Sequence, residues 1–124
     1  MFYSMAQNED KGMKEISIEK IIRQFINATN EFDVRAALEL FADDAVIDDV
    51  SVGKKYKNIA GVRKYLGKFF VGYHTVTRLE SLVLNDRDAT AHVDFTGDFG
   101  HETGGLNVTI NSDGLIIAID AYLD

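Results

Sequence analysis

The sequence predicts an α+β fold, in which a curved, mostly antiparallel sheet packs on three helices from the N-terminal half. Up to about residue 70, apolar residues recur every three or four positions, which is the period of an amphipathic helix. After residue 75 they alternate with polar residues, which is the period of a half-buried strand. With 124 residues the chain can form one domain with its own core, expected over residues 16–124, after a loosely structured tail at residues 1–15.

Three helices are expected from the spacing of the apolar residues. The first begins near Ser17 and carries apolar residues on one face as far as Ile26. The second is capped by Asp33 and continues to Phe41. The third runs over about residues 62–70, where Gly61 precedes it and Gly72 follows it.

Strands are expected at residues 45–50, 75–84, 89–99, 106–110 and 115–123, with a short strand possible around Tyr56. Residues 100–105 are expected to form a loop. The last four strands would form an antiparallel meander with one apolar face, which the helices must cover. Ala89, Ala91 and Gly97 on that face leave room for a pocket between sheet and helices.

One carboxylate falls on the inward face of the first strand. By alternation Ala45, Ile47 and Asp49 share a face, and a carboxylate in line with core residues is costly unless it is used or satisfied. Asp49 has two interpretations, a general base in a pocket or a structural carboxylate. In the second, it would accept backbone N–H groups of the turn at residues 51–55 or pair with Lys54 or Lys55.

Composition excludes several classes of function. The net charge of -7 argues against nucleic-acid binding, and no apolar run approaches the length of a membrane span. The absence of cysteine excludes a disulfide scaffold, a thiolate zinc site and a cysteine nucleophile, and it fits a cytoplasmic location. The three histidines, His74, His92 and His101, are scattered outside any metal motif, so we expect no metal and no cofactor.

Two further features allow more than one interpretation. The basic residues between Lys54 and Lys68 form either a solvated surface or a lip that attracts an anionic ligand. His101 lies in the expected loop at residues 100–105, from which it could reach a pocket mouth as a second acid–base group.

The order of elements and three sequence blocks resemble the nuclear transport factor 2-like superfamily, in its SnoaL-like and ketosteroid isomerase-like branch. The blocks are Phe41-Ala42-Asp43-Asp44-Ala45, Gly61-Val62-Arg63-Lys64-Tyr65-Leu66 and Asp113-Gly114-Leu115-Ile116. The resemblance covers residues 18–124 and implies a cone-shaped α+β barrel with a pocket between sheet and helices, often as a dimer. Because this fold supports many activities, the resemblance specifies the fold more closely than the function.

The resemblance to ketosteroid isomerases also implies roles for single positions. Their general-base aspartate falls on Asp49, whereas their oxyanion-hole tyrosine falls on Phe25 and a supporting tyrosine on Phe69. Their second, protonated acid falls near Leu106. The base is therefore retained without the oxyanion donors, and loss of such a donor lowers kcat by about 10²–10³-fold.

From these observations we expect a protein that binds a small apolar organic ligand. Asp49 would be the base of an isomerase, cyclase or dehydratase, in a pocket lined by Phe25, Ile47, Tyr65, Phe69, Val93, Phe95 and Leu106. The alternative is a non-catalytic ligand-binding or protein-interaction module, and the sequence leaves open whether the protein is an enzyme. A homodimer is expected through the convex face of the sheet, which carries His92, Asp94 and Thr96.

Overall fold

The computed structural model describes residues 17–124, so the expected tail at residues 1–15 lies outside the described residues. Within that range the chain forms helices, a π-helical turn and strands in a fixed order. They are α2 (Ser17–Asn30), α3 (Val34–Leu38), β1 (Phe41–Asp49), β2 (Lys54–Lys57), α4 (Asn58–Leu66), the π-helical turn η1 (Gly67–Val71), β3 (Val76–Leu84), β4 (Asp88–Gly97), β5 (Gly100–Ile110) and β6 (Ile116–Leu123).

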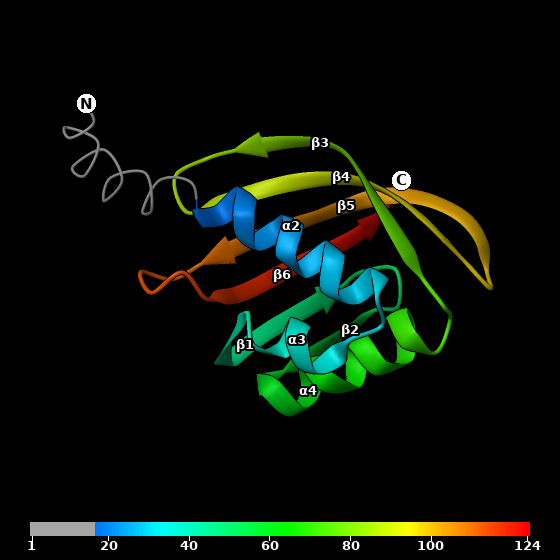
Figure 1. Cartoon of the computed structure of the whole chain (residues 1–124), viewed down its shortest axis with the longest axis horizontal. Helices are drawn as coiled ribbons and strands as arrows, with labels where there is room; N and C mark the ends of the chain where they lie inside the picture. Colours follow the sequence, from blue (N-terminus) through cyan, green and yellow to red (C-terminus); the bar gives the residue numbers. More distant parts are fainter. Residues whose placement is uncertain (1–16) are drawn as a thin grey trace.

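The strands form one curved sheet in the order β2-β1-β6-β5-β4-β3 (Figure 1). All neighbouring strands are antiparallel except β1 and β6, which run parallel from the pair Phe41–Ile116 to the pair Asp49–Ala121. The sheet is not closed, because β2 and β3 form its two free edges. The expected α+β class, with a mostly antiparallel sheet packed on three helices, is confirmed.

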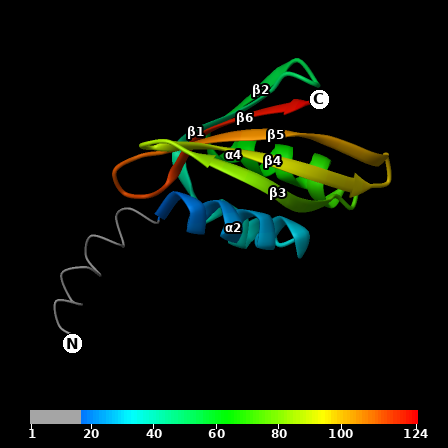
Figure 2. The ribbon, with the colours of Figure 1, turned by 90° about the horizontal axis from the view of Figure 1, so that it is seen from above.

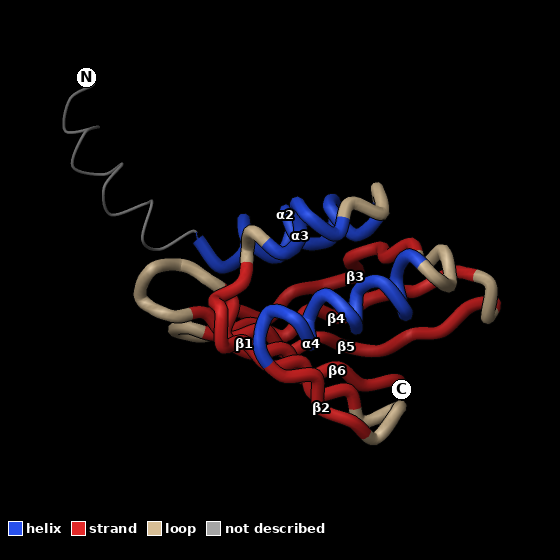
Figure 3. Tube along the Cα trace, turned by 90° about the horizontal axis from the view of Figure 1, so that it is seen from below, coloured by secondary structure: helices blue, strands red, loops and turns tan. Residues whose placement is uncertain are grey.

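The helices cover the sheet from one side and form the core with it. α2 lies across the sheet (Figures 1 and 2), and α4 lies against β1 and β2 (Figure 3). Ile22 of α2, Ile47 of β1 and Leu66 of α4 are each at most 1% exposed, so they meet in a continuous apolar core. Alternation in β1 is as expected, with Ala45, Ile47 and Asp49 all facing inward.

Two boundaries between α3 and β1 differ from the sequence expectation. α3 ends at Leu38 and β1 begins at Phe41, because Phe41 already pairs with Ile116 of β6. The expected cap is present, since the Asp33 carboxylate accepts the backbone N–H of Ala36 at 3.0 Å. The short strand that was possible around Tyr56 is present as β2, in which Tyr56 pairs with Ile47 and is 6% exposed.

α4 begins at Asn58, so Gly61 lies inside the helix and does not precede it. The side-chain oxygen of Asn58 accepts the backbone N–H groups of Ala60 and Gly61 at 3.1 and 3.3 Å, which gives the first turn partners. A Cβ at position 61 would lie 2.9 Å from the backbone carbonyl carbon of Tyr56, so glycine lets the helix approach β2 closely.

The expected loop at residues 100–105 is wrong, because these residues begin β5. The turn between Gly97 and Gly100 is tight, and beyond it Thr96 pairs with His101 and Phe95 with Glu102. The glycines and polar residues resemble a loop in sequence, but pairing with β4 supplies their backbone partners. In this strand Glu102, and not His101, lies on the face of the sheet that the helices cover.

Candidate functional site

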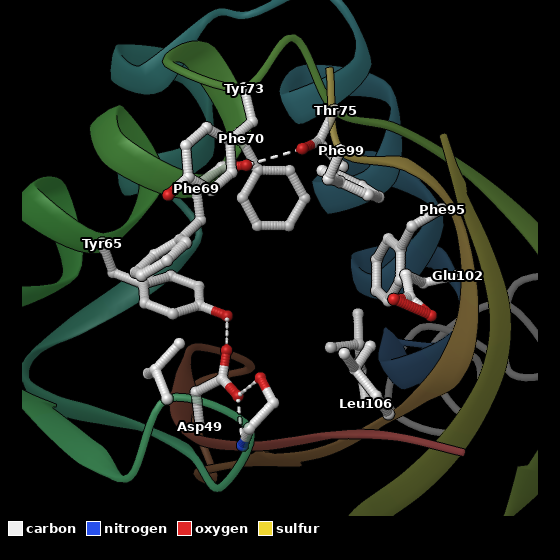
Figure 4. A pocket seen from close by; sticks show the side chains of 13 residues that line it. Asp49, Tyr65, Phe69, Phe70, Tyr73, Thr75, Phe95, Phe99, Glu102 and Leu106 are labelled. Carbon is white, nitrogen blue, oxygen red and sulfur yellow. Dashed lines mark hydrogen bonds between the residues drawn. The ribbon is translucent and has the colours of Figure 1, made fainter. Parts of the chain in front are cut away.

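A cavity of about 330 Å³ opens between α4, η1 and the concave face of the sheet (Figure 4). Most of the residues that line it are aromatic or aliphatic, and few are polar. They are Asp49, Ser51, Val52, Tyr65, Phe69, Phe70, Tyr73, Thr75, Phe95, Phe99, Glu102, Leu106 and Leu123. A volume of this size is within the range of small-molecule sites.

Asp49 lies at the end of β1, where its carboxylate faces the cavity and is held by three donors. Its Oδ1 accepts the backbone N–H of Ser51 at 2.9 Å and the Ser51 hydroxyl at 2.6 Å. Its Oδ2 accepts the phenolic O–H of Tyr65 at 2.6 Å, as Figure 4 shows. With 7% of the residue exposed, these hydrogen bonds replace much of the hydration that the carboxylate loses.

The two sequence interpretations of Asp49 therefore meet in one geometry. Its carboxylate lines the cavity, and it also accepts a backbone N–H from the turn that follows β1. Among the described residues no ion pair joins it to Lys54 or Lys55. Those lysines lie on β2 and do not line the cavity.

Tyr65 is the second polar side chain at the end of the cavity where Asp49 lies, which we call the polar end. Burial raises the pKa of its hydroxyl, and the hydrogen bond to Asp49 and the charge of Asp49 raise the pKa further. The phenol therefore stays protonated at neutral pH and donates its proton to the carboxylate. Its ring packs against Tyr56 and Phe69, with centroids 5.1 and 4.9 Å away.

The walls of the cavity are largely aromatic. The π-helical turn η1 supplies both Phe69 and Phe70, and Tyr73 follows with its ring 5.7 Å from that of Phe69. Phe99 continues the row at 6.3 Å from Tyr73. Insertions of π-helical geometry recur at functional sites, and here the turn presents two adjacent side chains to the same cavity.

Polar groups are sparse in the rest of the cavity. The Thr75 hydroxyl is engaged, since it donates to the backbone carbonyl of Phe69 at 2.6 Å. Glu102 lies on β5 opposite Phe95, exposed at the cavity wall. Tyr73 and Phe99 are 40% and 44% exposed, so this aromatic side of the cavity opens to solvent.

The structure separates the predicted site residues into two groups. Asp49, Tyr65, Phe69, Phe95 and Leu106 line the cavity. Three others do not and are buried in the core, namely Phe25, Ile47 and Val93. Phe25 packs edge-on against Phe41 and Phe70, at 5.8 and 6.1 Å between ring centroids.

His101 lies away from the cavity. Its imidazole contacts the Asp94 carboxylate, on the face of the sheet opposite to the one on which Glu102 lines the cavity. Burial of Asp94 opposes ionisation, but Arg78 and His101 prevail and hold the pKa of its carboxyl below the ordinary value. The cavity residue that this segment does supply, Glu102, is not predicted by the sequence, because the glycines and polar residues at 100–105 favour a loop.

The described residues hold no other kind of centre. In residues 17–124 no group of three or more histidine, aspartate or glutamate side chains could hold a metal ion. Across the same part of the chain, no helix has the length and apolar character needed to cross a membrane. A curved sheet under helices, with a largely aromatic cavity between them and a buried carboxylate in its lining, defines the chain as an α+β domain with an internal cavity.

The family follows from the sequence itself. Residues 22–117 match the model of the SnoaL-like domain, so the chain belongs to the SnoaL-like family of the nuclear transport factor 2-like superfamily. The resemblance drawn from the sequence blocks is thereby confirmed. No curated protein matches the sequence significantly.

Solved structures show the same fold at low identity. A Kribbella flavida protein assigned to the ketosteroid isomerases is 13% identical, with a TM-score of 0.80 over 90% of this chain and 80% of its own. The Mycobacterium tuberculosis protein RV0760c, in complex with estradiol-17beta-hemisuccinate, is 18% identical, with a TM-score of 0.78 over 87% and 94%. A Sinorhizobium meliloti protein assigned to the polyketide cyclases is 21% identical, with a TM-score of 0.76 over 85% and 97%.

Proposed function

We propose that the protein binds a small, largely apolar organic molecule in the cavity that ends at Asp49 and Tyr65. The observation that carries this proposal is the position of a buried, hydrogen-bonded carboxylate in the lining of a largely aromatic cavity. Binding removes apolar surface of the cavity walls and of the ligand from water, which supplies binding energy, and the polar groups at one end orient the ligand. A steroid derivative bound to a protein of the same fold supports the choice of an apolar ligand.

The finer proposal is cofactor-independent proton transfer, in an isomerase, cyclase or dehydratase step. Asp49 would accept a proton from an acidic C–H or O–H of the bound molecule through Oδ2, the oxygen that carries one hydrogen bond. The hydrogen bond from the Tyr65 hydroxyl to Asp49 is strongest when the carboxylate is ionised. It would therefore weaken when Asp49 takes the proton and strengthen again when Asp49 releases it. The aromatic walls would exclude water from the reacting atoms.

A second candidate, binding without catalysis, is favoured by the same hydrogen bonds. Three donors already hold the carboxylate, which leaves one of its lone-pair positions for a ligand. By the resemblance to ketosteroid isomerases, the oxyanion-hole tyrosine falls on Phe25 and the protonated acid near Leu106, and neither residue offers a donor. In this version Asp49 orients the ligand and takes no proton.

The experiment has two steps. A thermal-shift panel of apolar ketones, lactones, aryl alcohols and amines first identifies a ligand, and a ligand at 100 times its Kd is expected to stabilise the protein by about 2.7 kcal/mol. NMR then follows deuterium exchange of acidic C–H groups of that ligand with wild-type protein, Asp49→Asn and the neighbouring control Asp48→Asn. Exchange that is lost only in Asp49→Asn supports the catalytic form, and binding without exchange supports the non-catalytic form. A panel in which no compound stabilises the protein would contradict both.

A homodimer through the outer face of the sheet is a separate proposal. The helices cover the opposite face (Figure 2), so His92 and Thr96 remain exposed and Asp94 half-buried on the outer one. Sedimentation at micromolar concentration tests the dimer, and a strict monomer would contradict it.

A further inference from the structure

The polar end of the cavity offers hydrogen-bond acceptors and no free donor. The Ser51 and Tyr65 hydroxyl protons are both committed to the Asp49 carboxylate. A carboxylate has about four lone-pair positions, and three are taken here, so one remains on Oδ2. The Tyr65 oxygen, which donates its proton, also keeps lone pairs free at the same point. A ligand that meets this end of the cavity must therefore bring the donor itself.

The charged side chains that line the cavity have one sign. Of the residues that line it, Asp49 and Glu102 are the charged ones, and both are acids. An anionic ligand group would be repelled by both. A carbonyl oxygen of a ligand would find no free hydrogen-bond donor at the polar end, because the Ser51 and Tyr65 hydroxyls donate to Asp49. The basic residues proposed from the sequence as a lip for anions, from Lys54 to Lys68, do not line the cavity. Charge therefore favours a cationic ligand group over an anionic one.

The walls suit a cation as well. Tyr65, Phe69, Tyr73 and Phe99 form a continuous row of rings, with successive centroids 4.9, 5.7 and 6.3 Å apart. The face of an aromatic ring carries negative charge density and attracts ammonium groups. One ring of the row already does so, since the Lys68 ammonium lies 5.2 Å from the Phe69 centroid without lining the cavity.

From these three observations we propose that the ligand of this cavity is a small hydrophobic amine, bound in its protonated form. Its ammonium donates to Oδ2 of Asp49 and to the Tyr65 oxygen, and its apolar body lies along the aromatic row. Glu102 adds a second negative charge at the cavity wall. This inference deepens the proposed binding function and rests on it, because it specifies the chemical class of the bound molecule. It goes with the non-catalytic form, since the ammonium takes the position on Oδ2 that a base would use.

The test compares three molecules that share one apolar body and differ in the charge of one end. Phenylbutylamine, phenylbutanol and phenylbutyrate are titrated calorimetrically at pH 7 into the wild-type protein. The amine is expected to bind about tenfold more tightly than the alcohol or better, and the carboxylate least tightly. In Asp49→Asn the ratio of amine to alcohol affinity is expected to fall to about one, and in the control Asp48→Asn to stay at the wild-type value.

Asp48 is a matched control, because it is the neighbouring acid on the same strand and does not line the cavity. If Asp49→Asn does not fold, Glu102→Gln replaces it, since that exposed side chain carries no hydrogen bond of the fold among those described. Glu102→Gln is expected to lower the ratio of amine to alcohol affinity, by a smaller factor than Asp49→Asn.

Each contrary outcome has its own meaning. The proposal of an amine ligand is overturned if the alcohol and the amine bind equally well. It is also overturned if the preference for the amine survives both Asp49→Asn and Glu102→Gln. In either case the proposed binding of a small apolar molecule stands. The amine is also overturned, with that function again intact, if none of the three molecules binds while an apolar ketone does. If no compound of the thermal-shift panel or of this series binds, the proposed function is contradicted together with the amine.

Discussion

The side-chain amide of Asn30, the last residue of α2, pairs with the backbone of Thr77 in the edge strand β3. Its nitrogen donates to the Thr77 carbonyl at 2.9 Å, and its oxygen accepts the Thr77 N–H at 2.8 Å. The amide thus imitates a neighbouring strand at one position of a free sheet edge. This pair fixes the end of α2 against β3.

Replacement of Asn30 by alanine is expected to lower the free energy of unfolding by about 1–3 kcal/mol, because two partly buried backbone groups lose their partner. Denaturant unfolding measures the change. Asn27→Ala, on an exposed turn of the same helix, is the control and should be neutral or slightly stabilising, since alanine favours a helix. Equal effects of the two substitutions would contradict the role of the pair.

Replacement of Asp49 by alanine is expected to lower the free energy of unfolding by about 1–3 kcal/mol. The substitution leaves the Ser51 and Tyr65 donors without their acceptor in a buried place. Asp48→Ala should have a clearly smaller effect in the same unfolding experiment. A gain in stability in Asp49→Ala would show that the carboxylate is held at a cost, as in many functional sites.

The Tyr65 hydroxyl makes stability depend on pH on the alkaline side. An unfolded tyrosine ionises near pH 10, as model peptides do, whereas burial and Asp49 raise the pKa of Tyr65 in the folded protein. Above about pH 10 the folded state therefore holds more protons than the unfolded state, so stability falls as pH rises through that range, by up to about 1.4 kcal/mol per pH unit for this group. Tyr65→Phe should lack this component while keeping the slope that other groups contribute. Parallel curves for the two proteins between pH 9 and 11 would contradict the assignment.

Two adjacent glycines in β5 are expected to differ in their tolerance of alanine. A Cβ on Gly104 would clash with the backbone carbonyl of Tyr122, whereas one on Gly105 would meet the movable end of the Tyr122 side chain. Gly104→Ala should therefore cost about 1–3 kcal/mol, as overpacking does, and Gly105→Ala less. Thermal unfolding of both variants measures the difference. A larger loss in Gly105→Ala would contradict it.

The sequence predicted the fold and the inward position of Asp49 because both depend on local periodicity. Alternation from Ala45 to Asp49 assigns the faces of β1 without knowledge of any partner strand. The parallel pairing of β1 with β6 was not predicted, because it joins segments at opposite ends of the domain and no local pattern encodes it.

The site was predicted only in part for a similar reason. Helical spacing places Tyr65 on the apolar face of its helix. It does not show that the Tyr65 hydroxyl donates to Asp49, which lies 16 residues earlier in the chain on β1. Glu102 was missed because glycines and polar residues at 100–105 outweigh the weak alternation there. Continuing the alternation of β4 through the Gly97–Gly100 turn would have placed Glu102 beside Phe95.

The open sheet leaves β2 free to recruit a strand from another molecule, which is a route to aggregation. This edge is only four residues long, and Lys54, Lys55 and Lys57 occupy all of it except Tyr56. A second chain adding there would bring identical ammonium groups together, and their repulsion opposes the association. The three lysines of β2, for which the sequence also allowed a role as a lip for anions, therefore oppose strand addition at this edge of the sheet.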